Sequence, residues 1–356
     1  MAPLLIYVLE LRADSQPGEA GGANLTGDVY GHALEKNRCD AIFPPASRRS
    51  RRREKKLMNR QRQAYGYAFL TVLFWSTVAT AFKITLRYLS ALEMLLYASF
   101  TSTLILGIVL VLQGKLPLIR CCTRRDYLHS LILGFLNPFL YYLILFEAYD
   151  LLPAQEAQPL NYTWPLMLVI LAGLTGRERI DLPRIMTMLV SFIGILIIST
   201  RGDLISFRVT NLPGALLAMG SSIVWASYWL ANLRDRREEG VKLFLNFFFG
   251  FLYTLGLSIC LAKLGRPSWP GLVGAAYIGI FEMGITFFVW MKALTLSSSS
   301  IQVTRLIYLS PFISLIFIHF IGGETVRAAS FFGLLFIVAG IVLQEWVGHR
   351  VKAADK

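Results

Sequence analysis

Beyond residue 62 the chain alternates between apolar stretches of about 18–22 residues and short joints that hold charged residues, Gly or Pro. About 20 apolar residues cross the hydrocarbon core of a bilayer as a helix. Because backbone groups in lipid must bond within their own segment, these stretches are expected to be helices. The pattern predicts an all-α membrane protein with ten spans, at residues 65–84, 92–112, 129–149, 157–174, 183–200, 212–231, 243–262, 271–293, 300–320 and 329–347.

Residues 1–62 have a different character. The stretch Met1–Leu11 is apolar but too short to span, and it lacks the basic start of a signal peptide. A run rich in Arg and Lys follows at residues 47–56. It is either a polybasic arm for anionic lipid or part of a misassigned start, with Met58 as the first residue. We favour Met58 as the start and expect disorder up to residue 62 in either case.

The composition agrees with a membrane protein, because 55% of residues are hydrophobic and only 16% are charged. A soluble domain carries about 25% charged residues. The net charge of +13 would suit a nucleic-acid partner, but many basic residues lie in the joints and others in the N-terminal extension, so we exclude that partner. The four Cys and four His show no spacing typical of metal ligands, so no metal or cofactor is expected.

Lys and Arg are divided unequally between the two sets of joints, and cytoplasmic joints carry the excess. One set, with the C-terminal tail, holds fourteen: Lys115, Arg120, Arg124, Arg125, Arg177, Arg179, Arg184, Arg234, Arg236, Arg237, Lys242, Arg350, Lys352 and Lys356. The other holds six: Arg87, Arg201, Arg208, Lys263, Arg266 and Arg327. The count predicts that both termini are cytoplasmic, in a multi-pass protein of a bacterial inner (plasma) membrane.

The chain repeats itself at an offset of about 146 residues. Pro165, Gly176, Glu178 and Gly194 recur as Pro311, Gly322, Glu324 and Gly340. The repeats are expected at residues 63–203 and 210–348, followed by a tail at 349–356. Since each half holds five spans, an odd number, the second half must be inverted relative to the first. Inverted repeats are typical of secondary transporters that bind substrate near the bilayer midplane.

These residues resemble a known family. A Trp in the first span, Ala and then Pro in the third and fourth, and Gly-x-Glu after the fourth resemble the EamA repeat of the drug/metabolite transporter superfamily, over residues 66–347. The segment from Ala154 to Pro165, with Glu156, Asn161 and Tyr162, is also similar to the fourth helix of bacterial aromatic-amino-acid exporters. The resemblance implies a ten-helix transporter of small organic metabolites that uses no ATP.

Ionisable residues inside spans are costly and therefore mark candidate sites. Glu282 lies in the middle of the eighth span, and its repeat mate is Asn137 in the third. The two residues either converge on a central cavity or form a structural hydrogen bond between helices. Arg305, early in the ninth span, can hold a substrate carboxylate or pair with Glu282.

Aromatic residues recur in repeat register and suit a cavity that holds a ligand by its faces. The predicted substrate-binding set is Glu282, Asn137, Arg305, Trp75, Tyr141, Asn161, Tyr162, Trp225 and Tyr308. Glu178 and Glu324 are expected to bond helix ends across the repeats. Four glycines in the spans are expected to allow close helix packing, namely Gly134, Gly194, Gly279 and Gly340.

The resulting hypothesis is a secondary transporter, with export of amino acids or related metabolites as the favoured activity and possible proton coupling at Glu282. A non-transporting scaffold or a channel-like protein is an alternative. A lipid enzyme is a weaker one, because the scattered His and Cys supply neither a nucleophile with a base nor a metal cluster. We therefore expect no enzymatic activity. The sequence leaves the oligomeric state open.

The orientation is open to a direct test. A reporter fused after Lys356 should be active only in the form that senses the cytoplasm, because the basic joints lie on the side of the C-terminus. A fusion in the joint near Arg266 should give the opposite result. A periplasmic signal after Lys356 would contradict either the number of spans or their orientation.

Overall fold

The computed structural model describes residues 46–174, 182–203, 211–232, 235–263, 265–297 and 306–354. Within these ranges all regular structure is helical, which confirms the all-α prediction. The sequence predictions for residues 1–45, Glu178 and Arg305 lie outside the described residues.

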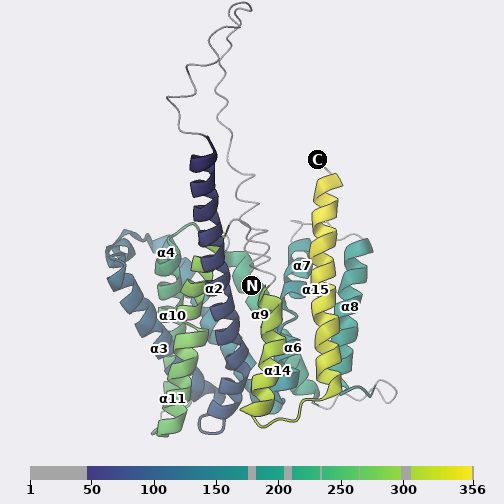
Figure 1. Ribbon diagram of the computed structural model, residues 1–356. Helices are drawn as coiled ribbons and strands as arrows, with labels where there is room; N and C mark the ends of the chain where they lie inside the picture. Colours follow the sequence, from purple (N-terminus) through teal and green to yellow (C-terminus); the bar gives the residue numbers. More distant parts are fainter. Residues whose placement is uncertain are drawn as a thin grey trace, which may run out of the picture.

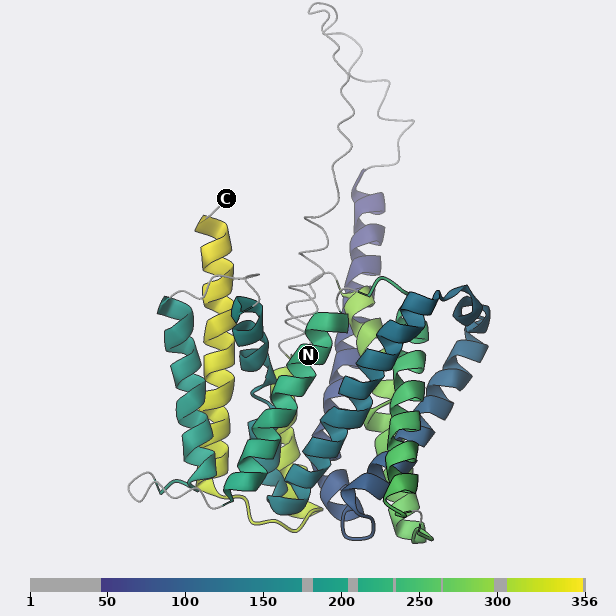
Figure 2. The same ribbon diagram turned by 180° about the vertical axis from the view of Figure 1, so that it is seen from behind.

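Long helices stand side by side in one bundle (Figures 1 and 2). Together with short 3-10 and π segments, labelled η, they are α2 (Ala46–Thr85), α3 (Ala91–Leu112), η2 (Leu116–Cys121), α4 (Arg124–Gly134), η3 (Phe135–Leu140), α5 (Tyr141–Leu151), α6 (Ala154–Asn161), α7 (Trp164–Leu174), α8 (Leu182–Ser199), α9 (Leu212–Asn232), α10 (Glu239–Cys260), α11 (Trp269–Tyr277), η4 (Ile278–Glu282), α12 (Ile285–Leu296), η5 (Leu306–Leu309), α14 (Ser310–Phe320) and α15 (Ala328–Ala354).

Six helical runs in the described residues are long and apolar enough to cross a bilayer, and shorter apolar helices cover Ile185–Ser199, Leu306–Phe320 and Ala328–Gln344. Helical residues overlap every predicted span, so the hydropathy pattern located the helices. The exact number of ten crossings stays a prediction.

The sequence predicts disorder up to residue 62, but in the structure helix α2 already begins at Ala46. Arg, Lys, Glu and Gln are good helix formers. Adding residues to a helix that the span has already nucleated is also far easier than starting a new one. The basic segment therefore continues the helix beyond the apolar stretch, and α2 projects from the bundle at the end where α15 also ends (Figure 1).

Four spans are interrupted, and the interruptions form two pairs of repeat mates. The third span is broken by η3 with Pro138 inside, and the eighth by η4. The fourth is broken between α6 and α7, and the ninth changes from 3-10 to α geometry where η5 meets α14. Pro165 and Pro311 each stand in the first turn after their break, where a missing N–H is tolerated.

Helix contacts follow the same two-fold pattern. Helix α2 packs on α12 and α14, and its repeat mate α9 packs on α5 and α7. Two of the most extensive pairs, α3 with α10 and α8 with α15, join repeat mates directly. The end of α2 and the start of α9 both lie beside the end of α5, where Lys83 donates to the Leu152 carbonyl and Asn211 to the Leu151 carbonyl. The two mates therefore run in opposite directions, as inverted repeats require.

Two glycines fix the spacing of the central helices. A Cβ at Gly134 would overlap the backbone carbonyl of Asn246 on α10, and one at its mate Gly279 would overlap the carbonyl of Ala98 on α3. Gly194 and Gly340 occupy equally tight places between α8 and α15, where a Cβ would meet the partner helix. The prediction of close packing at these glycines is confirmed.

The substitution Gly134→Ala should lower the stability of the protein by about 1–3 kcal/mol, because the added methyl group overpacks the contact with α10. The melting temperature in one detergent measures the effect. Gly220→Ala on α9 is the matched control, since open space surrounds that position and alanine favours the helix. Equal melting temperatures for the two variants would contradict the close contact.

Candidate functional site

A cavity lies between the two halves of the bundle. The centre of a water molecule can occupy about 80 Å³ of it. One water needs about 10–15 Å³ by this measure, so the cavity has room for several. Six of the nine predicted site residues line it: Trp75, Tyr141, Asn161, Tyr162, Trp225 and Glu282. These side chains come from α2, α5, α6, α9 and η4 and from the residue after α6, so both repeats contribute to one cavity.

Glu282 stands at the end of η4, where the eighth span is interrupted. Its Oε1 accepts a hydrogen bond of 3.1 Å from the hydroxyl of Tyr142 on α5. Tyr142 is fully buried, so this bond joins the repeats inside the protein. A carboxylate has several further acceptor positions, and among the described residues those of Glu282 have no other hydrogen-bond partner in the cavity that it lines.

Aromatic rings form two walls that are related by the repeat. The ring of Trp225 in the second repeat lies 4.5 Å from that of Tyr141 in the first, measured between centroids. The mate of Trp225 is Trp75, whose ring lies 6.3 Å from Phe287 and 6.2 Å from Trp290 in the second repeat. Each Trp therefore packs against aromatic residues of the opposite repeat. Such walls can hold an aromatic or cationic group by its face.

Helix α6 presents polar groups to the same cavity. Asn161 accepts from the Tyr141 hydroxyl at 3.3 Å and donates to Ser221 on α9 at 2.8 Å. Gln158 also lines the cavity with only 6% of its surface exposed, and its Oε1 is buried without a hydrogen-bond partner among the described residues. A buried acceptor that lacks a partner is costly unless a ligand or water completes it.

Sequence reasoning did not select Gln158, Tyr142, Tyr149, Trp164 or Phe287. Helical spacing would have indicated Gln158. It lies three residues before Asn161 and four before Tyr162, both of which were predicted, so the three share one helix face. No comparable signal marked Tyr142 or Phe287, whose places depend on how the repeats pack.

Asn137 and Tyr308 do not line this cavity. Asn137 occupies an extended conformation in η3 (φ −146°, ψ 121°), and its side chain interacts with Tyr228, to which Asn246 donates at 3.4 Å. The expectation that Asn137 converges with Glu282 is therefore replaced by a separate buried polar cluster of Asn137, Tyr228 and Asn246. Tyr308 lies buried in η5, and its neighbour Ile307 reaches the cavity instead. Arg305 lies outside the described residues.

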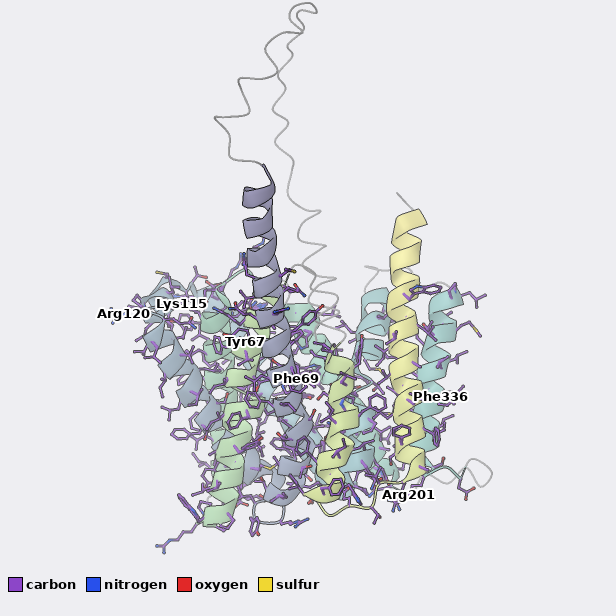
Figure 3. The ribbon with its side chains drawn as sticks, in the orientation of Figure 1. Tyr67, Phe69, Lys115, Arg120, Arg201 and Phe336 are labelled. Carbon is purple, nitrogen blue, oxygen red and sulfur yellow. The ribbon has the colours of Figure 1, made fainter. Side chains whose placement is uncertain are left out.

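The start of α6 is tied to the second repeat by a polar network that we call the α6 latch, formed by Ala154, Gln155, Glu156, Arg201, Glu324 and Arg327. The Oε1 of Glu156 accepts from Arg201 Nε and Arg327 Nη1, both at 2.8 Å, and the Glu156 side chain is only 2% exposed. Arg201 marks this end of the bundle in Figure 3, opposite to Arg120.

Backbone groups complete the α6 latch. Glu324 accepts from the Ala154 N–H at 2.8 Å and so satisfies the free start of α6, where a negative charge is favourable. Gln155 Oε1 accepts from the Arg327 N–H at 2.7 Å. The prediction that Glu324 bonds a helix end across the repeats is confirmed. Helix α6 therefore carries both Glu156 of the α6 latch and Gln158 of the cavity.

The sequence profile of the EamA-like transporter family matches residues 62–200 and 212–344. The chain belongs to this family. The two matches fall on the two halves that the internal repeat defines. Membership makes this EamA-like chain a membrane transporter protein, with small molecules as the class of substrate and the lipid bilayer as its surroundings.

Curated relatives extend the comparison. The aromatic amino acid exporter YddG of Ancylobacter novellus is 29% identical over 231 residues, which are 62% of this chain and 76% of the relative. Protein PecM of Dickeya dadantii is 24% identical and covers 78% of this chain and 91% of its own length. The uncharacterized inner membrane transporter YhbE of Escherichia coli is 21% identical and covers 80% of this chain and 91% of its own length. A solved crystal structure, 21% identical with a TM-score of 0.55 over 81% of this chain and 97% of its own, has the same fold.

The α6 latch of this EamA-like protein can be measured by a double-mutant cycle. Glu156→Gln and Arg327→Gln should each lower the melting temperature, and together they should lower it by less than the sum. We expect a coupling energy of about 1 kcal/mol, because Arg327 is partly exposed and solvent screens the pair. Strictly additive effects would show that the ion pair contributes nothing to stability.

Proposed function

We propose that this protein is a secondary transporter of a bacterial inner membrane that exports small organic metabolites, amino acids and related amines among them. The observation that carries the proposal is a carboxylate, Glu282, inside an aromatic cavity to which both repeats contribute. The names of two relatives agree with it, since one is an aromatic amino acid exporter and another an inner membrane transporter.

The chemistry of the cavity favours an ammonium group attached to an apolar or aromatic body. Glu282 supplies a negative charge, and Gln158 supplies an acceptor oxygen without a partner among the described residues. Hydrogen bonds between an ammonium and such oxygens are strong because they are charge-assisted. The rings of Trp75, Tyr141 and Trp225 offer faces for the remainder of the substrate.

Alternating access follows from the arrangement of the repeats around this cavity. In inverted-repeat transporters one repeat rocks against the other around a fixed site. The α6 latch holds the repeats together at the end of the bundle marked by Arg201, so this end must part when the cavity opens there. The equivalent residues in the other repeat lie outside the described residues: the start of α6 corresponds to the segment near residue 300, and Glu324 corresponds to Glu178.

Proton coupling is the mechanism that we assign to Glu282. A substrate ammonium and a proton both neutralise a carboxylate, so they compete for the same group. A coupling ion shifts a conformational equilibrium only through a difference in affinity between the two states. The bond from Tyr142 crosses between the repeats, so movement of one repeat against the other changes the surroundings of Glu282.

The substitution Glu282→Gln should leave the protein folded and reduce transport at least roughly tenfold, since the neutral amide loses a charge-assisted hydrogen bond. Uptake and efflux in proteoliposomes, for a panel of aromatic amino acids and the corresponding amines with and without a proton gradient, measure the effect. The matched control is Glu147→Gln on α5, because Glu147 is exposed and lies outside the cavity.

Two results would contradict this assignment. Transport by Glu282→Gln at the wild-type rate, with the wild-type dependence on pH, would remove Glu282 from the mechanism. A lowered melting temperature combined with normal transport by the folded fraction would make the carboxylate structural. Loss of transport in the Glu147→Gln control would show that the assay reports general damage to the protein.

A further inference from the structure

A second pocket, separate from the central cavity, lies on the outside of the bundle beside the start of α4. It offers about 640 Å³ and shares no residue with the cavity. We call it the α4 pocket, and its lining is Arg125, Asp126, Leu128, His129, Ile132, Asp235, Arg236 and Arg237. The start of α4 lies at the end of the bundle where α15 ends, near Lys115 and Arg120 (Figures 1 and 3).

One ion pair anchors the floor of the α4 pocket. Arg237 donates from Nε and Nη2 to the carboxylate of Asp235, and Nη2 also donates to Ser130 on α4 at 2.8 Å. Burial alone would raise the pKa of Asp235, but the hydrogen bonds from Arg237 outweigh it and hold the pKa below its usual value. The pair is therefore ionised and fixed. The remaining nitrogen, Arg237 Nη1, is buried and has no partner among the described residues.

The other charges of the α4 pocket leave an excess of positive groups. Asp126 is occupied as the capping residue of α4, where it accepts from the N–H and hydroxyl of Thr123. Arg125 and Arg236 are exposed and form no hydrogen bond or ion pair within the described residues. His129 Nε2 is buried and also lacks a partner there. Arg125, Arg236 and His129 thus bring unpaired donors to a pocket whose two carboxylates, Asp126 and Asp235, already accept hydrogen bonds.

Apolar side chains continue the same face of α4 toward the interior of the bilayer. Leu128 and Ile132 are 56% and 55% exposed, and they lie one turn apart on the helix. Arg125 precedes Leu128 by three residues, so the face is cationic at its start and apolar further along. A phospholipid has the matching order, with a phosphate at the surface and acyl chains below it.

We propose that the α4 pocket binds an anionic phospholipid. The exposed side chains of Arg125 and Arg236 contact the phosphate group, and an acyl chain lies along Leu128 and Ile132. Phosphate oxygens are acceptors and match the donors that lack partners. Basic pockets between helices at the bilayer surface bind anionic headgroups in the same way.

The α4 pocket also spans the two repeats, since α4 belongs to the first and the segment from Asp235 to Arg237 belongs to the second. A lipid bound there contacts both. Its binding therefore stabilises the arrangement in which the Arg237 side chain reaches Ser130. An anionic lipid should consequently raise the melting temperature of the protein, and this effect does not depend on which substrate is transported.

The test uses the purified full chain in a neutral detergent with added phosphatidylglycerol or phosphatidylcholine. Native mass spectrometry counts bound lipid, and the melting temperature reports stabilisation. Phosphatidylglycerol should bind and raise the melting temperature, and phosphatidylcholine should do so much less. The double variant Arg125→Gln/Arg236→Gln should bind phosphatidylglycerol at least roughly tenfold more weakly than the wild type, because each basic group at the surface adds to the attraction.

The controls separate a lipid site from other sources of the signal. Arg120→Gln removes an exposed Arg at the same end but outside the α4 pocket and should bind phosphatidylglycerol as the wild type does. Without lipid the double variant should melt at the wild-type temperature, since neither Arg forms a hydrogen bond or ion pair with a described residue. The single variant Arg236→Gln serves if the double variant is unstable.

Either of two outcomes would overturn the proposal. If the double variant retains wild-type affinity for phosphatidylglycerol, the α4 pocket is not the site. If inorganic phosphate alone gives the same rise in melting temperature as phosphatidylglycerol, the site takes a free anion and the apolar face has no part in it.

Discussion

A bilayer offers no hydrogen-bond partner to the backbone, and this constraint governs where the helices of this protein can be interrupted. A break in a span leaves N–H and C=O groups that only other parts of the protein or enclosed water can satisfy. The four breaks, at η3, at η4, between α6 and α7, and before α14, are accordingly packed inside the bundle. Three of them supply cavity residues: Glu282 ends η4, Asn161 ends α6, and Ile307 lies in η5.

The repeat explains why the breaks occur in pairs, and divergence between the halves explains why the site is not symmetric. Asn137 and Glu282 occupy equivalent breaks, yet only Glu282 reaches the cavity. Asn137 lies against Tyr228 and Asn246, which form a buried cluster of neutral polar groups. The two equivalent helices therefore carry different chemistry, with a charge on one side of the molecule and a structural network on the other.

Helix α6 connects the parts of the molecule that have polar roles. Its first turn is tied to the second repeat through Glu156 and Glu324, and its last turn carries Gln158 and Asn161 into the cavity. One helix of eight residues therefore carries both the residues of the α6 latch and polar residues of the cavity.

The sequence by itself determined the helices, the repeat, the family and six of the residues that line the cavity. Hydropathy located each helix because lipid leaves the backbone few alternatives, and the register of Trp75 with Trp225 and of Pro165 with Pro311 revealed the two halves. Glu324 could be assigned to a helix end because it follows a glycine at the close of a span.

Only the tertiary structure decided which polar groups meet. Gln158 faces the cavity, Asn137 turns away from it, and Arg327 pairs with Glu156, 171 residues earlier in the chain. The start of α2 also differed from the predicted start of the first span, because helix propagation extended α2 into the basic segment. Hydropathy gives the depth of a side chain in the membrane but not the direction in which it points. That direction depends on how helices from both repeats pack, and close approaches such as that of Gly134 to α10 set it.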